Sequence, residues 1–497
     1  MSSVIVIGGG PAGVSAALRA RELGANVALV ERDHLGGTCT NDGCVPTRVL
    51  AHAARLAREA EQFAAYGLAE YQPQIDLGAL MDKTHNIVSE IHTKKGLAAT
   101  LAAAGVQLYA GLGPAQFINP HTLRLGDGRE LYGDRFILCA GGRARQLSFP
   151  GSELALTHGD IWRMRTAPAS LAIVGGAATG CQMASIFAAF GTRVTLLERN
   201  TRLLAAEDDL VGELVTGAFE RRGIKIIRSI RGVEKIERDG RDLRLYYRIG
   251  DELLSLTTEA VILAAGWIGN VESLNLEAAG VAHERNFIGV DDYLRTSAEH
   301  IFAAGDITGR MMLVQSGSFD ARLAAENAVL GLGPRYRHAI VPHGGFTDPE
   351  YGSVGMTEKQ AQAAGLDYVT GVVPYIHLDR AVIDGRTEGA CKLVVGRETH
   401  RILGAHIVGE QALESIQLAA AGMASDMWVE QLAELELAYP TYTAVLGLAA
   451  RQVVRKLGVM ALSAQWLELG LGHGEWESAS GPFSGPAGLT GGAGLGG

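Results

Sequence analysis

The sequence contains few cysteines, few aromatic residues and no excess of positive charge. Five cysteines in 497 residues are a sparse, odd-numbered set, which argues against the disulfide scaffold of a secreted protein. Basic residues (44) are outnumbered by acidic ones (54), and the net charge of −10 argues against a nucleic-acid binder. The first residues show neither the basic segment nor the cleavage site of a signal peptide, and no apolar run of about 18 residues is seen. We therefore expect a cytoplasmic protein without a membrane span.

Glycine, by contrast, is abundant, with 65 residues, and apolar residues make up 47% of the chain. This length and composition predict about two to four domains with large buried cores. Enrichment in glycine is typical of nucleotide-binding α/β folds, where the backbone approaches phosphate groups closely.

A β-turn-α-β unit opens the chain. An apolar strand at 4–7 leads into the glycine-rich turn 8–13, an alanine-rich helix to about residue 23, and a strand at 27–30 that ends in an acidic residue. The glycines permit a tight turn, and the helix N-terminus faces a pyrophosphate. The side chain of Glu31 is positioned to bind ribose hydroxyls. The first nucleotide site is predicted to include Gly8, Gly10, Pro11, Ala12, Gly13, Glu31 and Arg32.

The same unit recurs over residues 171–198, and this repetition indicates a second nucleotide. Ala177 stands where a third glycine is usual, and its methyl group is expected to crowd the pyrophosphate. Glu198 favours NADH, whereas Arg199 and Arg202 could clamp the 2′-phosphate of NADPH, and the choice stays open. The second site is predicted to include Gly175, Gly176, Gly180, Gln182, Glu198, Arg199 and Gly266.

The segment between the two units contains Cys39 and Cys44, separated by four residues. The two sulfurs can close a small ring if a helix starts at Cys44, and Pro46 fits such a start. A helix N-terminus lowers the pKa of a thiol and favours the thiolate, which could donate to a flavin. The alternatives are two unrelated buried cysteines or half of a zinc site. No further ligands stand nearby, so no metal is expected.

Other segments predict the remaining architecture. Helices are expected at 45–66 and 79–104, a hairpin at 123–131, and buried strands at 136–139 and 261–264 that end at nucleotides. Strands and helices alternate differently from about residue 336 onward, as in a separate α+β domain. Cys139, Cys181 and Cys391 are predicted to be core thiols. The glycine-rich tail, 466–497, is predicted to be disordered.

These motifs together resemble the class I pyridine nucleotide–disulfide oxidoreductases, such as dihydrolipoamide dehydrogenase, glutathione reductase and mercuric reductase. The resemblance covers about residues 4–457 and includes the glycine motif, the cysteine pair, Ala304-Gly305-Asp306 and the segment 346–350. It implies an α/β fold with two Rossmann-like domains, for FAD (1–148 and 267–335) and for NAD(P) (149–266). A C-terminal α+β dimerisation domain (336–465) would complete the partner subunit's active site in a homodimer.

The resemblance also implies roles for individual residues. Cys44 resembles the thiol nearest the flavin, Cys39 resembles the thiol that attacks the acceptor, and Asp306 would bind the ribityl chain of FAD. The cofactors would be FAD and NADH or NADPH. Further flavin-site residues implied in this way are Gly37, Thr38, Arg48, Ala140, Gly141 and Gly305.

Several positions depart from the family pattern. Tyr439 and Ala444 replace the C-terminal His and Glu, and a tyrosine with a pKa near ~10 is a poor general base. No cysteine follows Cys391, so the C-terminal pair of mercuric reductases is missing. Arg48 and Gln182 replace a Lys–Glu pair, which is expected to leave Arg48 without a carboxylate and to raise the flavin potential.

The expected function is that of an FAD-dependent NAD(P)H oxidoreductase. Electrons would pass through Cys39 and Cys44, with Tyr439 and Arg48 in the catalytic site, to a disulfide or other small-molecule or protein acceptor. Four alternatives remain: a soluble transhydrogenase, which the sequence Tyr-Pro-Thr at 439–441 resembles, a mercuric or other metal-ion reductase, a quinone reductase, and a redox-sensing flavoprotein.

Overall fold

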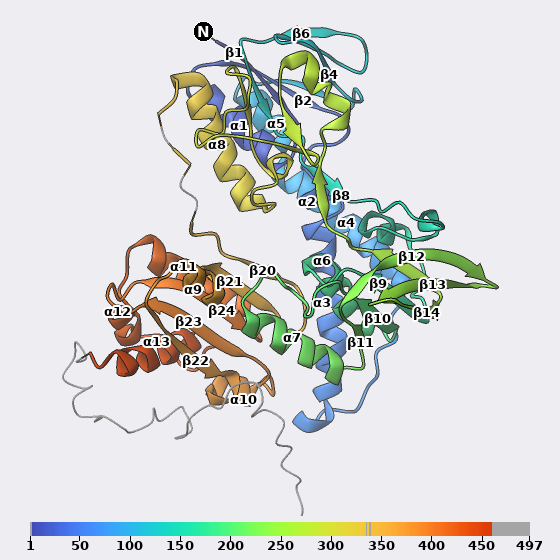
Figure 1. Ribbon diagram of the computed structural model, residues 1–497, viewed down its shortest axis with the longest axis vertical. Coiled ribbons are helices and arrows are strands. Elements are labelled where there is room, and N and C mark those ends of the chain that lie inside the picture. The colour runs from blue at the N-terminus through green and yellow to red at the C-terminus, as the bar shows by residue number, and fades with distance from the viewer. Residues whose placement is uncertain (1, 334, 337–338, 460–497) are drawn as a thin grey trace, which may run out of the picture.

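The computed structural model describes residues 2–333, 335–336 and 339–459. Two parallel sheets and one antiparallel five-stranded sheet form three regions, each with its own buried core. Figure 1 shows these regions as separate masses, with the long helix α3 (Cys44–Glu59) running from the upper one down between the other two. The arrangement confirms the predicted fold: two Rossmann-like units and a C-terminal α+β region.

The first sheet is parallel, and its strands are nearly continuous apolar runs because helices or further strands cover both faces. Strands β1 and β2 are joined by α1 (Pro11–Glu22), which starts with proline at its first position, where a missing N–H costs nothing. The spatial order is β19 (Ile301–Ala303), β7 (Arg135–Leu138), β1 (Ser3–Ile7), β2 (Asn26–Glu31) and β3 (Gln107–Ala110).

Helix α8 packs along α1, and a small antiparallel sheet lies beside the parallel one. Residues 126–128 form the turn of the predicted hairpin between β5 and β6. The other elements of this region are α2 (Gly37–Asn41), α4 (Leu77–Lys95), α5 (Leu97–Ala103), β4 (Gln116–Asn119), β5 (Thr122–Arg124), β6 (Glu130–Tyr132), β17 (His283–Glu284), β18 (Phe287–Ile288) and α8 (Val314–Leu330).

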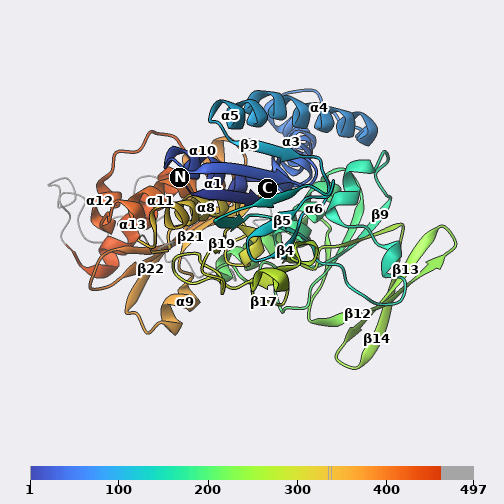
Figure 2. The ribbon, with the colours of Figure 1, turned by 90° about the horizontal axis from the view of Figure 1, so that it is seen from above.

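The second parallel sheet repeats the pattern of the first, with α6 (Ala178–Ala189) in the place of α1. Its strands are β11 (Lys225–Ile227), β10 (Arg193–Leu197), β9 (Ser170–Val174) and β15 (Ala260–Leu263). Helix α7 (Asp209–Arg221) follows β10, and Figure 2 shows an antiparallel sheet that projects outward, built from β12 (Ile230–Asp239), β13 (Asp242–Ile249) and β14 (Glu252–Thr258).

The chain crosses between these two regions twice, and the two crossing segments pair as β8 (Gly142–Ala144) and β16 (Trp267–Gly269). The C-terminal sheet has the order β20 (His343–Gly345), β21 (Tyr351–Gly355), β24 (Ile402–Val408), β23 (Ala390–Gly396) and β22 (Tyr368–Pro374). The helices of this region are α9 (Glu358–Ala363), α10 (Asp379–Ile383), α11 (Ala412–Ala424), α12 (Val429–Glu434) and α13 (Ala444–Leu457).

Two helix predictions were wrong in extent. The helix expected at 79–104 is two helices, because Gly96 has φ +50° and ends α4 in a left-handed conformation. The helix expected at 45–66 is regular only to Glu59 and continues as two short 3₁₀ turns. The tail predicted to be disordered lies outside the described residues. Within the described part of the chain, no helix has the length and apolar character needed to cross a bilayer.

Candidate active site

The two cysteines of the central segment lie at the ends of neighbouring helices. Cys39 is in the short helix α2, and Cys44 is the first residue of α3, as predicted. The two thiols are in hydrogen-bonding contact; Cys39 is half-buried and Cys44 is exposed. A Cβ atom on Gly37 would stand 2.8 Å from the Cα of Gly10, so the first glycine-rich turn abuts the cysteine segment.

The contact shifts the pKa values of the two thiols in opposite directions. The hydrogen bond from the Cys39 thiol lowers the pKa of Cys44 to about 7 against the opposing effect of burial, and the backbone N–H at the start of α3 adds to this. The same hydrogen bond, followed by burial, raises the pKa of Cys39. Cys44 is therefore the sulfur that holds negative charge at neutral pH, and Cys39 is the protonated one.

The end of α4 holds the cysteine segment from one side. The Nε2 of His92 donates to the Oδ1 of Asn41 at 2.7 Å, and the Nζ of Lys95 donates to the Oγ1 of Thr40 at 2.9 Å. Asn41 in turn donates to the carbonyl of Gly37. The sequence analysis missed both basic residues, because they lie about fifty positions away and no local motif marks them.

The other side of the segment faces the second region. The carboxylate of Asp42 lies 3.7 Å from the Nε2 of His158, and the indole of Trp162 donates to the Asp42 carbonyl at 3.0 Å. Burial lowers the pKa of His158 and raises that of Asp42. The ring centres of His158 and Trp267 lie 4.8 Å apart.

Both glycine-rich turns leave the start of a helix open. Gly10 and Ala177 are the N-cap residues of α1 and α6, and no side chain makes a capping bond there. The N–H groups of the first turn therefore point outward and can bind a pyrophosphate. The Oε2 of Glu31 accepts from the N–H of Gly9 at 2.6 Å, and the Oε2 of Glu198 accepts from that of Gly176 at 2.6 Å.

Each of the two glutamates therefore braces its own turn. Glu31 also accepts from the N–H of Asp33, and Glu198 accepts from the N–H of Asn200. The two Oε2 atoms each accept one bond from their turn and retain a lone pair for a ribose hydroxyl, whereas the Oε1 of Glu198 also accepts from the Nδ2 of Asn200. Beyond the first turn, Gly141 at φ +69° has no atom within 4 Å of a hypothetical Cβ, and burial raises the pKa of Asp306. These residues fit an extended dinucleotide such as FAD.

The expectation that Arg48 lacks a carboxylate was wrong. Its Nη1 donates to the Oε1 of Glu350 at 2.8 Å, and its guanidinium lies 4.7 Å from the ring centre of Phe346. Gln182, which replaces the usual acidic residue, accepts from the N–H of Phe346 at 2.9 Å. The counter-charge comes from a strand segment near β21 instead of from α6, a substitution that spacing in the sequence does not reveal.

Three further candidates are placed as follows. Arg202 donates to backbone carbonyls of its own loop and pairs with Asp209 at 2.9 Å, so the predicted clamp on a 2′-phosphate is not formed by this residue. Tyr439 is 53% exposed and donates its hydroxyl to Asp379. The Nε2 of His343 lies 3.3 Å from a carboxylate oxygen of Glu207.

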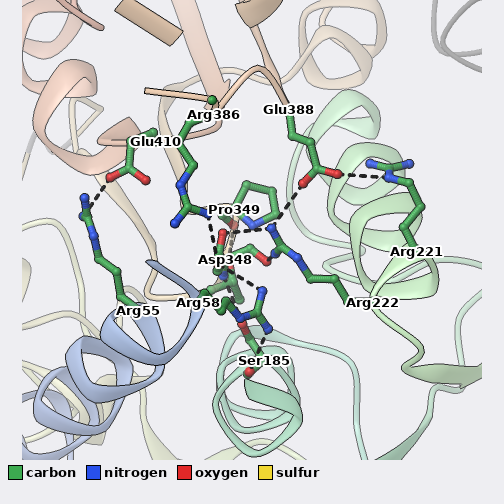
Figure 3. A network of polar contacts seen from close by, with 12 residues as sticks. Arg55, Arg58, Ser185, Arg221, Arg222, Asp348, Pro349, Arg386, Glu388 and Glu410 are labelled. Atoms are coloured by element: carbon green, nitrogen blue, oxygen red, sulfur yellow. Dashed lines mark hydrogen bonds and ion pairs between the residues drawn. The ribbon is translucent and has the colours of Figure 1, made fainter. Parts of the chain in front are cut away.

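A network of arginines and carboxylates joins the three regions near the C-terminal end of α3, the end opposite Cys44 (Figure 3). At its centre, the Asp348 carboxylate accepts from Arg58 at 3.0 Å and pairs with Arg222 at 3.1 Å. The N–H of Asp348 donates to the Oγ of Ser185 at 3.0 Å, and Arg58 donates to the Ser185 carbonyl at 3.1 Å. Arg58 itself is only 5% exposed. The network fixes α3 against α6 and the C-terminal region.

Cys139, Cys181 and Cys391 are buried, which confirms their predicted place in the core. Burial raises the pKa of Cys139 to about 12. Among the described residues, no group of three or more His, Cys, Asp or Glu side chains could hold a metal ion.

Comparisons with known proteins agree with this geometry. Residues 2–321 match the family described as "Pyridine nucleotide-disulphide oxidoreductase", and residues 341–450 match its dimerisation domain. A mercuric reductase of Bacillus cereus is 32% identical over 90% of this chain and 70% of its own length. A dihydrolipoyl dehydrogenase of Zymomonas mobilis is 32% identical over 83% of this chain and 90% of its own length.

A solved structure shows the same architecture. The HOCl-induced flavoprotein disulfide reductase RclA of Escherichia coli is 27% identical, with a TM-score of 0.80 over 91% of this chain and 100% of that chain. The same reductase has also been solved as a Cu(II) complex. With two nucleotide turns, a thiol pair and a dimerisation domain in the family's order, the chain belongs to the pyridine nucleotide-disulphide oxidoreductases and is a flavin-dependent enzyme that uses FAD and NAD(P)H.

Proposed function

We propose that the enzyme passes electrons from NAD(P)H through Cys39 and Cys44 to a disulfide acceptor. The observation that carries this proposal is the contact between the two thiols at the start of α3, with the pKa of Cys44 lowered to about 7. A thiolate beside a thiol is the form from which a dithiol exchanges with a disulfide. When bound, FAD supplies the two-electron link between NAD(P)H and the sulfur pair.

The two cysteines can divide the exchange between them without an external base. Cys44 accepts the proton of the neighbouring Cys39 thiol, and the Cys39 thiolate attacks one sulfur of the acceptor, releasing one thiolate. Cys44 then attacks the sulfur of Cys39 in the mixed disulfide and releases the second half of the acceptor, to which the proton passes. The products are a Cys39–Cys44 disulfide and two reduced sulfur groups, and two electrons have moved.

This internal proton transfer matters because Tyr439 stands where relatives of this type carry a histidine. Its hydroxyl is committed to Asp379, and a phenol is a weak base at neutral pH. Exchange should therefore depend on the thiolate fraction of the cysteine pair, and we expect slower reduction of lipoamide or glutathione disulfide than in relatives that have the histidine.

A metal ion is the second acceptor to consider, because relatives include mercuric reductases and a reductase solved with Cu(II). Outside the two thiols, the described residues offer no cluster of three or more ligating side chains. A disulfide therefore ranks first, and an acceptor panel should include Hg²⁺, Cu²⁺ and a quinone beside disulfides.

We also propose that the enzyme is a homodimer assembled through the C-terminal region, which matches the family's dimerisation domain. Large apolar side chains are exposed around α10, among them Ile376 (51%), Val382 (55%) and Ile383 (56%). Such a patch is typical of an interface. Light scattering should give twice the mass of the chain, and Val382→Asp should shift it toward the monomer.

The decisive experiment reduces the holoenzyme anaerobically with NADH and with NADPH and follows the visible spectrum. Two-electron reduction should produce a long-wavelength band from a Cys44 thiolate beside the flavin. In Cys39→Ser, Cys44 cannot form the disulfide, so the band should be present before reduction and should disappear when NAD(P)H reduces the flavin, with disulfide turnover abolished. Cys44→Ser should show neither the band nor disulfide turnover. Full turnover in both single variants would show that the electrons bypass the sulfur pair, as in a transhydrogenase.

A further inference from the structure

The last turn of α4 places a fixed positive charge beside the sulfur that is proposed to meet the acceptor. The Nζ of Lys95 donates to the Oγ1 of Thr40 at 2.9 Å, and Thr40 is the residue directly after Cys39. Thr40 is completely buried, whereas Lys95 is exposed. The ammonium group of this exposed side chain thus lies against the residue that follows Cys39, close enough for its charge to act on the Cys39 sulfur.

Two further features of the local structure hold Lys95 in this place. Gly96 adopts φ +50° and ends α4, so that Lys95 is the last residue of the helix. One turn earlier, the Nε2 of His92 donates to the Oδ1 of Asn41 at 2.7 Å. The cysteine segment is therefore bound to this helix end at two successive residues, 40 and 41.

Lys95 differs in charge from the other groups that act on Cys39. Those that act on its sulfur are Cys44, Lys95 and Asp306. Cys44 and Asp306 carry or can carry negative charge, and each raises the pKa of Cys39, whereas the positive charge of Lys95 lowers it. An acceptor that reaches Cys39 therefore meets the positive charge of Lys95.

We infer that Lys95 is a specificity-determining residue that makes Cys39 prefer acceptors carrying negative charge, such as disulfides that bear carboxylates. The inference rests on the proposed function, because it concerns the same route out of the enzyme. Lys95 could instead serve only to stabilise α4, because lysines in the last turn of a helix interact favourably with the helix dipole. Lys94 shares that stabilising role but points about 100° away around the helix, which makes it a matched control.

The test measures charge at Cys39 without any natural acceptor. In the reduced holoprotein with Cys44→Ser, the other three cysteines are buried, so alkylation reports on Cys39. The rate with anionic iodoacetate is divided by the rate with neutral iodoacetamide at one pH and low salt. Lys95→Met should lower this ratio about threefold, because one unit charge within about a Debye length is lost.

Lys95→Arg should preserve the ratio, Lys94→Met should leave it unchanged, and added salt should reduce the difference between wild type and Lys95→Met. An unchanged ratio in Lys95→Met, or an equal fall in Lys94→Met, overturns the inference. In the enzyme with both cysteines, kcat/KM for the dianionic disulfide 5,5′-dithiobis(2-nitrobenzoate) should fall about threefold relative to neutral 4,4′-dithiodipyridine.

These measurements separate the proposed function from the role of Lys95. If neither disulfide is reduced by the wild-type enzyme, the proposed function is wrong, although the alkylation ratio can still show the charge at Cys39. If both disulfides are reduced and Lys95→Met affects them equally, the proposed function stands and the role of Lys95 in specificity is wrong.

Discussion

The two glycine-rich turns have nearly the same geometry although they lie in different regions of the molecule. Gly8 and Gly175 have φ +108° and +115°, conformations that glycine adopts without strain. A Cβ on Gly13 would stand 1.7 Å from the carbonyl oxygen of Gly8, and one on Gly180 would stand 1.8 Å from that of Gly175. The same residues at the same spacing therefore fix the same turn, whatever surrounds it.

The helices that follow the turns differ in what they contact. Helix α1 packs on α8 within its own region, and the partly exposed ion pair of Arg19 with Glu326 joins the same two helices. Helix α6 instead contacts α3 and, through Gln182 and Ser185, the segment 346–348 of the C-terminal region. Both copies of the repeat thus contain the binding turn. The helix of the second copy, α6, also packs on α3, the helix that begins at Cys44.

The largest expected effect comes from breaking the link of α6. Arg58→Met removes the buried donor to Asp348 and to the carbonyl of Ser185, and leaves polar atoms unpaired. Loss of one partner in a buried charged network costs about 3 kcal/mol, so the midpoint of denaturant unfolding should fall clearly. Because α3 carries Cys44, the long-wavelength band of the reduced enzyme should weaken as well.

Arg19→Met is the matched control on the other helix. Its side chain is 34% exposed and pairs across α1 and α8, and surface pairs contribute little. The melting temperature should stay within experimental error. Equal destabilisation by the two variants would contradict the view that only α6 is coupled to the rest of the molecule.

A smaller effect is expected where the two turns differ in sequence. Gly10 and Ala177 have almost the same backbone, φ −74° and −85°, so either residue fits the fold at either place. A Cβ on Gly10 would meet only the Cα of Gly37, at 3.6 Å. Ala177→Gly should therefore leave the melting temperature unchanged and tighten binding of NADH about fivefold, about 1 kcal/mol, because the methyl group crowds the pyrophosphate.

The reverse substitution can be made at the equivalent position of the first turn. Gly10→Ala should weaken retention of FAD without unfolding the protein, which flavin content after gel filtration would measure. If Ala177→Gly leaves the Kd for NADH unchanged while Gly10→Ala also has no effect, the methyl group at this position does not meet the nucleotide. Which of NADH and NADPH the enzyme prefers is read from the same titrations.

Local sequence patterns were sufficient to predict turns, helix starts and buried side chains. The turn at Gly8–Gly13, the helix start at Cys44 and the burial of Cys391 depend on neighbouring residues or on apolar runs. The pairing of Arg48 with Glu350 and of Thr40 with Lys95 joins residues about 300 and about 55 positions apart. Contacts between residues so far apart leave no periodic pattern in the sequence. The prediction that Arg48 has no carboxylate partner was therefore wrong, and the role of Lys95 was not predicted.

The smallest expected effect concerns the contact between Glu207 of the second region and His343 on β20 of the C-terminal sheet. His343 on β20 lies opposite Ser353, which lies opposite His406, and Glu207 faces this row from the loop before α7. Burial alone would lower the pKa of His343, but the hydrogen bond and charge of Glu207 outweigh it, so the pKa is raised. For His406, burial dominates and lowers the pKa.

The signs of these two shifts separate the histidines by pH. The raised pKa of His343 gives stability that is complete below about pH 6.5 and is lost as the pH rises through the higher folded value. His406 acts in the opposite direction and weakens the fold only as the pH falls below about 6.5. His343→Gln should therefore lower the melting temperature by a few degrees at pH 6 and by less at pH 8. A difference that is equal at both pH values would mean that the charge on His343 does not contribute to the contact between the second unit and the C-terminal sheet.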